Sequence, residues 1–179
     1  MASLSYLDVL RLSGDVFMGG LMTVTELGLP SEFIYSEPIT ADKLQVSLYG
    51  TTLGRYLMVD VVGKGLIEAS KARGTPVIVG RSDLLALAIR VKRPLCQLSI
   101  SNQRPFAEVG ELQPRNETEV LVQLNDVQSP YVISIYDRIS FPVEKHLPVF
   151  IECASRFDLL EPFQRVERTL ELLKDGADE

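Results

Sequence analysis

The sequence predicts a single α/β or α+β domain in which amphipathic helices flank a mixed β-sheet. Three observations indicate this fold. A short, continuous apolar run at 75–80 is typical of a central strand that is buried on both faces. Two pairs of strand-like segments, at 16–35 and 119–137, are each joined by a short connection and predict two β-hairpins. Segments with one apolar face, typical of helices, lie between and after these strands.

The N-terminal part of the chain is expected to form a helix and then the first hairpin. Leucines and a valine recur through residues 1–12 at spacings that favour a helix, and a glycine follows that could end it. Residues 16–25 and 32–35 are rich in strand formers. Gly19 and Gly20 in the first of these strands indicate a bulge or the close approach of another element.

Helices and strands are expected to alternate through the middle of the chain. They follow in the order helix, helix, strand, helix, strand, at 41–49, 53–72, 75–80, 84–89 and 94–100. Gly63 and Gly65 favour a kink or close packing in the second helix, because a glycine costs about 1 kcal/mol in a helix interior. This alternation is typical of an α/β crossover.

The C-terminal part is expected to contain a loop, the second hairpin and a helix. The polar segment 102–118 contains two prolines and predicts an exposed loop. Residues 119–125 and 131–137 alternate between apolar and polar and predict the two strands of the hairpin. An irregular connection through His146 then leads to a brief strand, a terminal helix and a frayed acidic tail, at 149–151, 158–174 and 175–179. We expect residues 1–179 to form one globular domain.

Composition and charge limit the partners that we expect. Of the 179 residues, 46% are hydrophobic and 23% are charged, which is ordinary for a globular domain. The formal net charge of −6 gives no overall basic footprint, so nucleic acid is not expected as a partner. The basic segment Arg90-Val91-Lys92-Arg93 is interpreted as the solvated end of an element. The chain shows no signal segment and no apolar run of membrane-spanning length, which favours a cytoplasmic protein without a membrane partner.

Few side chains are suited to chemistry, since the chain has one histidine, two cysteines and no tryptophan. A Cys/His pair could involve only His146 with Cys96 or Cys153. Both cysteines lie in apolar segments, as buried free thiols do in a reducing compartment. Acidic residues do not follow metal-ligand spacings, and no cofactor motif is present. We therefore expect no catalytic residue, no metal ion and no cofactor, which favours a protein that is not an enzyme.

The best candidate for a ligand site is the turn formed by Gly80, Arg81, Ser82 and Asp83. A buried strand that leads into a helix start presents free backbone N–H groups to an anion. In open α/β sheets this is where ligands bind, and Arg81 could bind a carboxylate or phosphate with its guanidinium. Arg55, at a second glycine-flanked helix start, is the other candidate. An ordinary turn, capped by Ser82 and with Arg81 in water, stays open as the alternative.

The function favoured by these patterns is a non-catalytic protein-binding or assembly module that self-associates as a homodimer or binds a protein partner. Two hairpins between amphipathic helices resemble the scaffold domains of the profilin or roadblock type, and the resemblance implies association through sheet edges or helix faces. One alternative is a regulatory domain that binds a small anionic metabolite at 80–83. The other is a lyase or isomerase that uses arginines and carboxylates. The acids available to it are Asp60, Asp83, Asp137 and Glu152.

Overall fold

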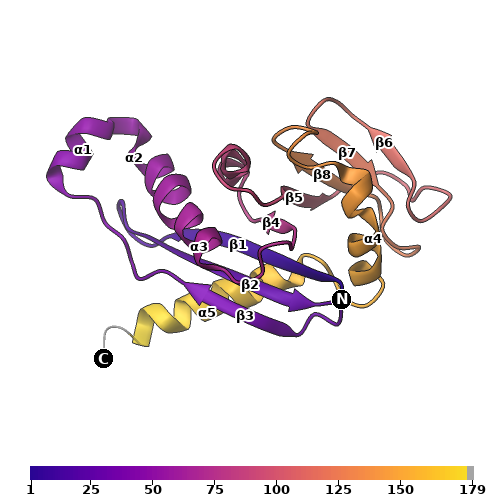
Figure 1. Ribbon diagram of the computed structural model, residues 1–179, viewed down its shortest axis with the longest axis horizontal. Coiled ribbons are helices and arrows are strands. Elements are labelled where there is room, and N and C mark those ends of the chain that lie inside the picture. The colour runs from indigo at the N-terminus through magenta and orange to yellow at the C-terminus, as the bar shows by residue number, and fades with distance from the viewer. Residues whose placement is uncertain (177–179) are drawn as a thin grey trace.

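The computed structural model describes residues 1–176 and contains one mixed sheet of eight strands with helices on both faces (Figure 1). The strands are β1 (Ser3–Arg11), β2 (Phe17–Thr25), β3 (Pro30–Tyr35), β4 (Val77–Val79), β5 (Leu95–Ile100), β6 (Leu112–Pro114), β7 (Glu119–Val122) and β8 (Tyr131–Ile135). Their order across the sheet is β3-β2-β1-β4-β5-β8-β7-β6. β1, β4 and β5 are parallel to one another, whereas the other neighbours are antiparallel. The predicted fold class is confirmed.

The helical elements lie between β3 and β5 and at the C-terminal end. They are α1 (Lys43–Tyr49), η1 (Gly50–Thr52), α2 (Leu53–Arg55), η2 (Tyr56–Gly63), α3 (Lys64–Ala69), η3 (Ser82–Ile89), α4 (Val143–Ala154) and α5 (Glu161–Gly176). The segment η2 is a π-helix inside a longer helical run, and it ends at Gly63, which packs closely against Leu84 and Leu87 of η3. The expected irregularity at this glycine is therefore confirmed. Among the described helices, none is long and apolar enough to cross a membrane.

The two faces of the sheet carry separate cores because successive residues of β1 point to opposite sides. Leu4 and Tyr6 belong to a core that also includes residues of α4 and α5. Leu7 and Val9 belong to a second core with residues of η2, α3 and η3. In Figure 1, α5 accordingly runs along one side of the β1–β3 part of the sheet, while α2 and α3 lie on the other. Strand β1 thus lies in the middle of three layers.

The two adjacent glycines of β2 allow helices to approach the sheet from both sides. A Cβ on Gly19 would overlap Val62 of η2. A Cβ on Gly20 would lie 3.2 Å from both Val166 and Leu170 of α5. The close approach that this glycine pair predicted is confirmed.

Two segments differ from the sequence prediction. Residues 1–12 contain β1 and not a helix, and every residue from Leu4 to Val9 except Asp8 is buried. A strand covered on both faces is apolar at successive positions, so it lacks the alternation that marks a half-exposed strand. Residues 143–154 form α4, where an irregular connection and a strand at 149–151 were expected. Pro148 lies inside this helix, and the burial of Phe150 and Cys153 offsets its cost of roughly 3 kcal/mol.

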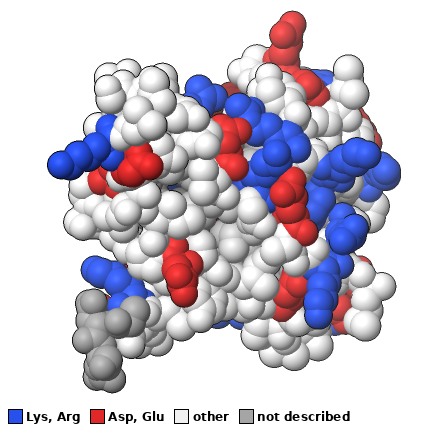
Figure 2. Space-filling view, turned by 60° about the vertical axis from the view of Figure 1, so that its left-hand side comes forward, with Lys and Arg blue, Asp and Glu red and all other residues white. Residues whose placement is uncertain are grey.

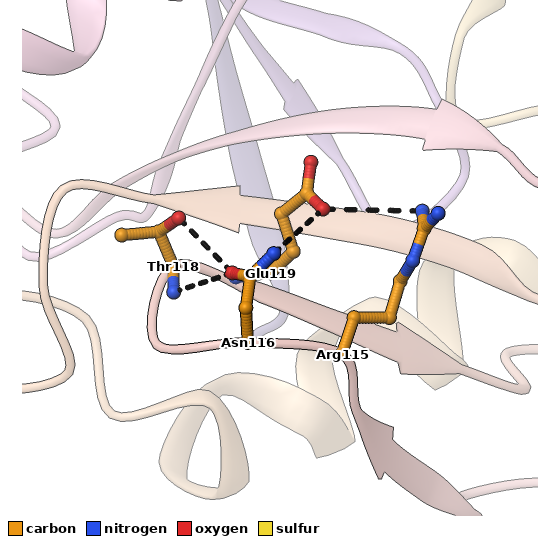
Figure 3. A network of polar contacts seen from close by, with 4 residues as sticks. All are labelled: Arg115, Asn116, Thr118 and Glu119. Carbon is orange, nitrogen blue, oxygen red and sulfur yellow. Dashed lines mark hydrogen bonds and ion pairs between the residues drawn. The ribbon is translucent and has the colours of Figure 1, made fainter.

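The predicted loop at 102–118 contains one further strand. Its residues 112–114 are β6, which pairs with β7, so the loop prediction is wrong there. The turn that joins β6 to β7 is closed by Asn116, whose Oδ1 accepts hydrogen bonds from the backbone N–H groups of Thr118 and Glu119 at 2.9 Å each (Figure 3). Glu119 Oε2 in turn accepts from Asn116 Nδ2 at 3.2 Å. Of the expected tail, residues 175–176 belong to α5, and residues 177–179 lie outside the described part of the chain.

Candidate functional site

An acidic residue and a glycine meet at the carboxyl ends of the central parallel strands. Strand β1 has an antiparallel neighbour, β2, on one side and a parallel neighbour, β4, on the other. The strand order also reverses there, because β2 and β3 lie on one side of β1 and β4 and β5 lie on the other. Ligands of open α/β sheets bind beyond the carboxyl ends of the strands at such a reversal. Asp8 lies in β1 near this end, and Gly80 directly follows β4 and donates its backbone N–H to Leu7 O at 2.9 Å. The sheet itself therefore sets the position of the carboxylate.

Asp8 is paired with Arg81, the residue that follows Gly80. The Nε of Arg81 lies 3.1 Å from Oδ1 of Asp8, which also accepts the backbone N–H of Val9 at 2.8 Å. The Asp8 side chain is 16% exposed and that of Arg81 is 44% exposed. Burial raises the pKa of Asp8, and the charge of Arg81 opposes this shift. Because Arg81 uses only Nε, its other N–H groups make no hydrogen bond within residues 1–176.

The structure changes the picture of the predicted turn at 80–83. The N–H of Gly80 is not free for a ligand, because it bonds to β1. Ser82 does not cap a helix: it is the first residue of η3, and the preceding Arg81 makes no side-chain cap bond. Ser82 and Asp83 are exposed. Arg81 is thus the group of this turn best placed to bind an anion, and sequence reasoning missed Asp8, which orients it.

Arg55 lies in a different place. It lines a surface hollow of about 400 Å³ that includes none of residues 80–83. The other residues of this hollow are Tyr49, Thr52, Tyr56, Asp60, Ala86, Ile89, Arg90 and Tyr136. The structure therefore separates the predicted ligand residues into two groups.

The basic segment 90–93 was expected to be the solvated end of an element. In the structure it contains both structural and exposed residues. Arg93 is buried; its guanidinium donates to Ser5 Oγ and Thr75 O at 2.8 Å each, and burial lowers its pKa to about 10. Arg90 is paired with Asp60. Figure 2 shows that Lys and Arg side chains gather on one side of that view, with acidic side chains among them. A negative net charge therefore does not prevent local basic surface.

The histidine and the cysteines have structural surroundings. The ring of His146 packs on Phe141 with centroids 4.6 Å apart, and burial lowers the pKa of the histidine. Cys96 and Cys153 are buried free thiols, as predicted, and burial raises the pKa of Cys153 to about 11. In the described part of the chain, no three or more His, Cys, Asp or Glu side chains are placed to hold a metal ion together.

The acids proposed for lyase or isomerase chemistry serve separate local contacts. Asp60 pairs with Arg90, and Glu152 lies 4.0 Å from Arg156. Asp137 Oδ1 accepts the backbone N–H groups of residues 139 and 140 in its own turn, and these bonds lower its pKa. Asp83 is exposed. The contacts of these four acids give no sign of a common site.

The chain shares its fold with Endonuclease V. No protein-family model and no curated protein sequence matches it. The structure of Endonuclease V from Streptomyces avermitilis is similar with a TM-score of 0.65 and 12% identity, over 99% of this chain and 83% of that one. The catalytic domain of human Endonuclease V is similar with a TM-score of 0.55 and 15% identity, over 99% of this chain and 84% of that one. Ciona intestinalis Endonuclease V is similar with a TM-score of 0.57 and 8% identity, over 98% of this chain and 87% of that one. That structure is a complex with DNA containing an inosine followed by a ribo-adenosine.

This similarity corrects the functional predictions. The prediction of a non-catalytic module for protein binding or assembly, without a nucleic-acid partner, is wrong, because the similar structures are nucleases and two of them are bound to DNA. The same finding overturns its alternatives, a regulatory domain that binds a metabolite at 80–83 and a lyase or isomerase. The sequence concealed this for two reasons. At 12% identity the sequence matches no family model, and the net acidity hides the local basic surface. One signal was available: Asp8 is a lone acid within an otherwise apolar segment.

Proposed function

We propose that this protein acts in nucleic-acid processing by binding a nucleic-acid strand beyond the carboxyl ends of β1 and β4. The observation that carries the proposal is the Asp8–Arg81 pair, which lies at the edge where ligands of such sheets bind, within a fold shared with Endonuclease V over 99% of the chain. A similar structure was determined with inosine-containing DNA, which favours a strand as the ligand.

Arg81 supplies the chemistry for a phosphate contact. A guanidinium binds the oxygens of a phosphate through paired N–H groups. Asp8 holds the Nε side of Arg81, so the remaining N–H groups are oriented before a ligand arrives. Such contacts to the backbone fix the position of a strand without reading its sequence. Asp8 is therefore a positioning residue, and Arg81 is the binding residue.

The described residues do not fit a two-metal nuclease centre. Enzymes of that kind clamp the attacking and leaving oxygens between two ions, and Mg²⁺ ions in such sites are held by one or two carboxylates together with waters and substrate phosphates. Here Asp8 is paired with Arg81, and residues 1–176 hold no group of three or more metal-binding side chains. The geometry supports the binding of a strand, and no cleavage step follows from it.

Fluorescence anisotropy of a labelled single-stranded DNA, with and without one inosine, tests the proposal. The RNA of the same sequence is measured in parallel, each over a series of salt concentrations. We expect salt-dependent binding. Arg81→Ala should weaken it on all three strands and reduce the salt slope by about one phosphate contact. The matched control is Arg104→Ala, which removes an exposed arginine that has no side-chain partner in residues 1–176.

Two results would count against the proposal. The absence of salt-dependent binding to any of the strands would overturn it. Equal binding by wild type and Arg81→Ala would show that the strand binds elsewhere on the protein and not at this edge of the sheet. In a separate experiment, the strand is incubated with the protein and Mg²⁺. Cleavage by wild type that is abolished in Asp8→Asn would show that a metal centre forms when substrate is bound.

A further inference from the structure

A second site lies in the hollow of about 400 Å³ between the start of the long helical run and η3. Small-molecule sites have volumes of roughly 300–1,000 Å³, so a ligand of modest size would fit. Thr52, Arg55 and Tyr56 line it from one side, and Ala86 and Ile89 from the other. Elements far apart in the sequence thus build this hollow together.

Aromatic side chains are concentrated there. Tyr49 and Tyr56 stack with their ring centroids 4.2 Å apart and their planes 20° apart. Both are partly buried and pack against the core on this face of the sheet, which fixes the pair in place. Tyr136, which is 41% exposed, also lines the hollow. Three of the six tyrosines of the chain therefore meet at one surface site, where a planar ring could stack.

The charges of the hollow favour an anion beside the rings. Arg90 donates through Nε to Asp60 and through Nη1 to Ala86 O at 3.0 Å, so these two charges compensate each other. Arg55 is exposed and makes no side-chain hydrogen bond or ion pair within residues 1–176. The cation left over in the hollow is therefore Arg55.

We infer that this hollow binds a nucleotide, with the base against the tyrosines and the phosphate against Arg55. Every base offers a flat face, so aromatic side chains bind bases without strong sequence preference. The nucleotide could be free or part of a strand. The second case rests on the proposed function, whereas the first does not.

If the bound nucleotide is part of a strand, the distance between Arg81 and the hollow sets a minimum length for that strand. Arg81 directly precedes η3, and Ile89 at its other end lines the hollow. Eight residues of 3₁₀-helix span roughly 16 Å at about 2 Å each. A stacked strand covers that length with about five nucleotides at about 3.4 Å each. A strand that reaches both sites must be longer than this.

The test uses single substitutions in the full chain. Tyr56→Leu removes one ring of the stack, and Arg55→Ala removes the cation. Tyr35→Leu and Arg104→Ala are their controls, because both residues are exposed and neither lines the hollow. Tyr136→Ala, at an exposed position, keeps the test valid if Tyr56→Leu fails to fold. Anisotropy is measured with oligothymidylates of about four and about twelve nucleotides, and adenosine monophosphate is titrated separately.

We expect Tyr56→Leu or Tyr136→Ala to weaken binding of the longer strand roughly 5- to 150-fold, the equivalent of one lost base–aromatic stack. Arg55→Ala should weaken it too, and the two controls should not. Since the chain lacks tryptophan, binding should also quench its tyrosine fluorescence. That quenching should decrease in Tyr56→Phe while affinity is retained.

The outcomes separate the two proposals. Suppose that wild type binds the strand, and that the tyrosine variants and Arg55→Ala bind it as tightly as wild type does. The second site is then wrong, and the proposed function stands. If adenosine monophosphate binds and Tyr56→Leu or Tyr136→Ala abolishes this while no strand binds, the site takes a free nucleotide and the proposed function is wrong. If neither ligand binds to wild type, both proposals are overturned.

Discussion

Gly80 lies directly against the carboxylate of Asp8. A Cβ at position 80 would be 2.7 Å from Cγ of Asp8 and 2.9 Å from each of its oxygens. Position 80 therefore requires a glycine for space and not for a left-handed backbone, because its φ is not positive. The residue after β4 thus keeps room for the acid of β1 and leads into Arg81, which pairs with that acid.

Gly80→Ala should destabilise the fold and displace Asp8. The added methyl group has no room, and overpacking of this kind typically costs about 1–3 kcal/mol. The same substitution in an Asp8→Ala background should cost much less, because the obstructing carboxylate is gone. Urea unfolding of the four proteins of this double-mutant cycle measures the coupling. Additive effects of the two substitutions would show that the methyl group does not meet Asp8.

Asp8→Asn should change the pH dependence of stability. Burial raises the pKa of Asp8 above its ordinary value of 3.8, so the folded chain holds this proton more tightly than the unfolded chain. Wild type should therefore lose stability as pH rises from 3.8 through the raised pKa, and the asparagine variant should not show this contribution. Denaturant unfolding of both proteins, below pH 3.8 and at neutral pH, gives the difference. A gain for the variant that is equal at both pH values would contradict the assignment.

Tyr6→Phe should be neutral or should stabilise the protein by up to about 1 kcal/mol. The hydroxyl of Tyr6 is buried and has no hydrogen-bond partner among residues 1–176, so its removal ends an uncompensated loss of hydration. Tyr131→Phe is the matched control. The Tyr131 hydroxyl donates to Gln128 Oε1 at 2.8 Å, and its loss should cost about 1 kcal/mol. Thermal unfolding compares the two; a larger loss for Tyr6→Phe would reveal a partner of its hydroxyl.

Arg93→Ala should be among the most damaging single substitutions, with a loss of about 3 kcal/mol. It would leave the buried Ser5 hydroxyl without this donor and open a space beneath β1. Lys92→Ala, at the exposed neighbouring position, should change stability by less than about 0.5 kcal/mol. Urea unfolding of both variants measures the contrast. Similar small effects would mean that the Arg93 network adds little to stability.

Local patterns decided those elements that have one clear physical signature. The run at 77–79 is apolar at every position, as is typical of a doubly covered strand, and the adjacent glycines of β2 indicated a bulge or close neighbours. Tertiary structure overrode the local pattern in β1 and α4. Covering β1 on both faces removed its alternation, and the packing of Phe150 and Cys153 outweighed the proline inside α4.

The sequence by itself determined the class of fold, the buried strand that precedes Arg81 and the burial of both cysteines, because each depends on neighbouring residues or on composition. Only the tertiary structure decided what surrounds Arg81. Asp8 lies 73 positions away along the chain, and it meets Arg81 because β1 and β4 are parallel neighbours in one sheet. The same holds for the tyrosines and arginines of the second hollow, which come from three separate segments. Spacing along the chain carries no information about such contacts, since strand order sets them.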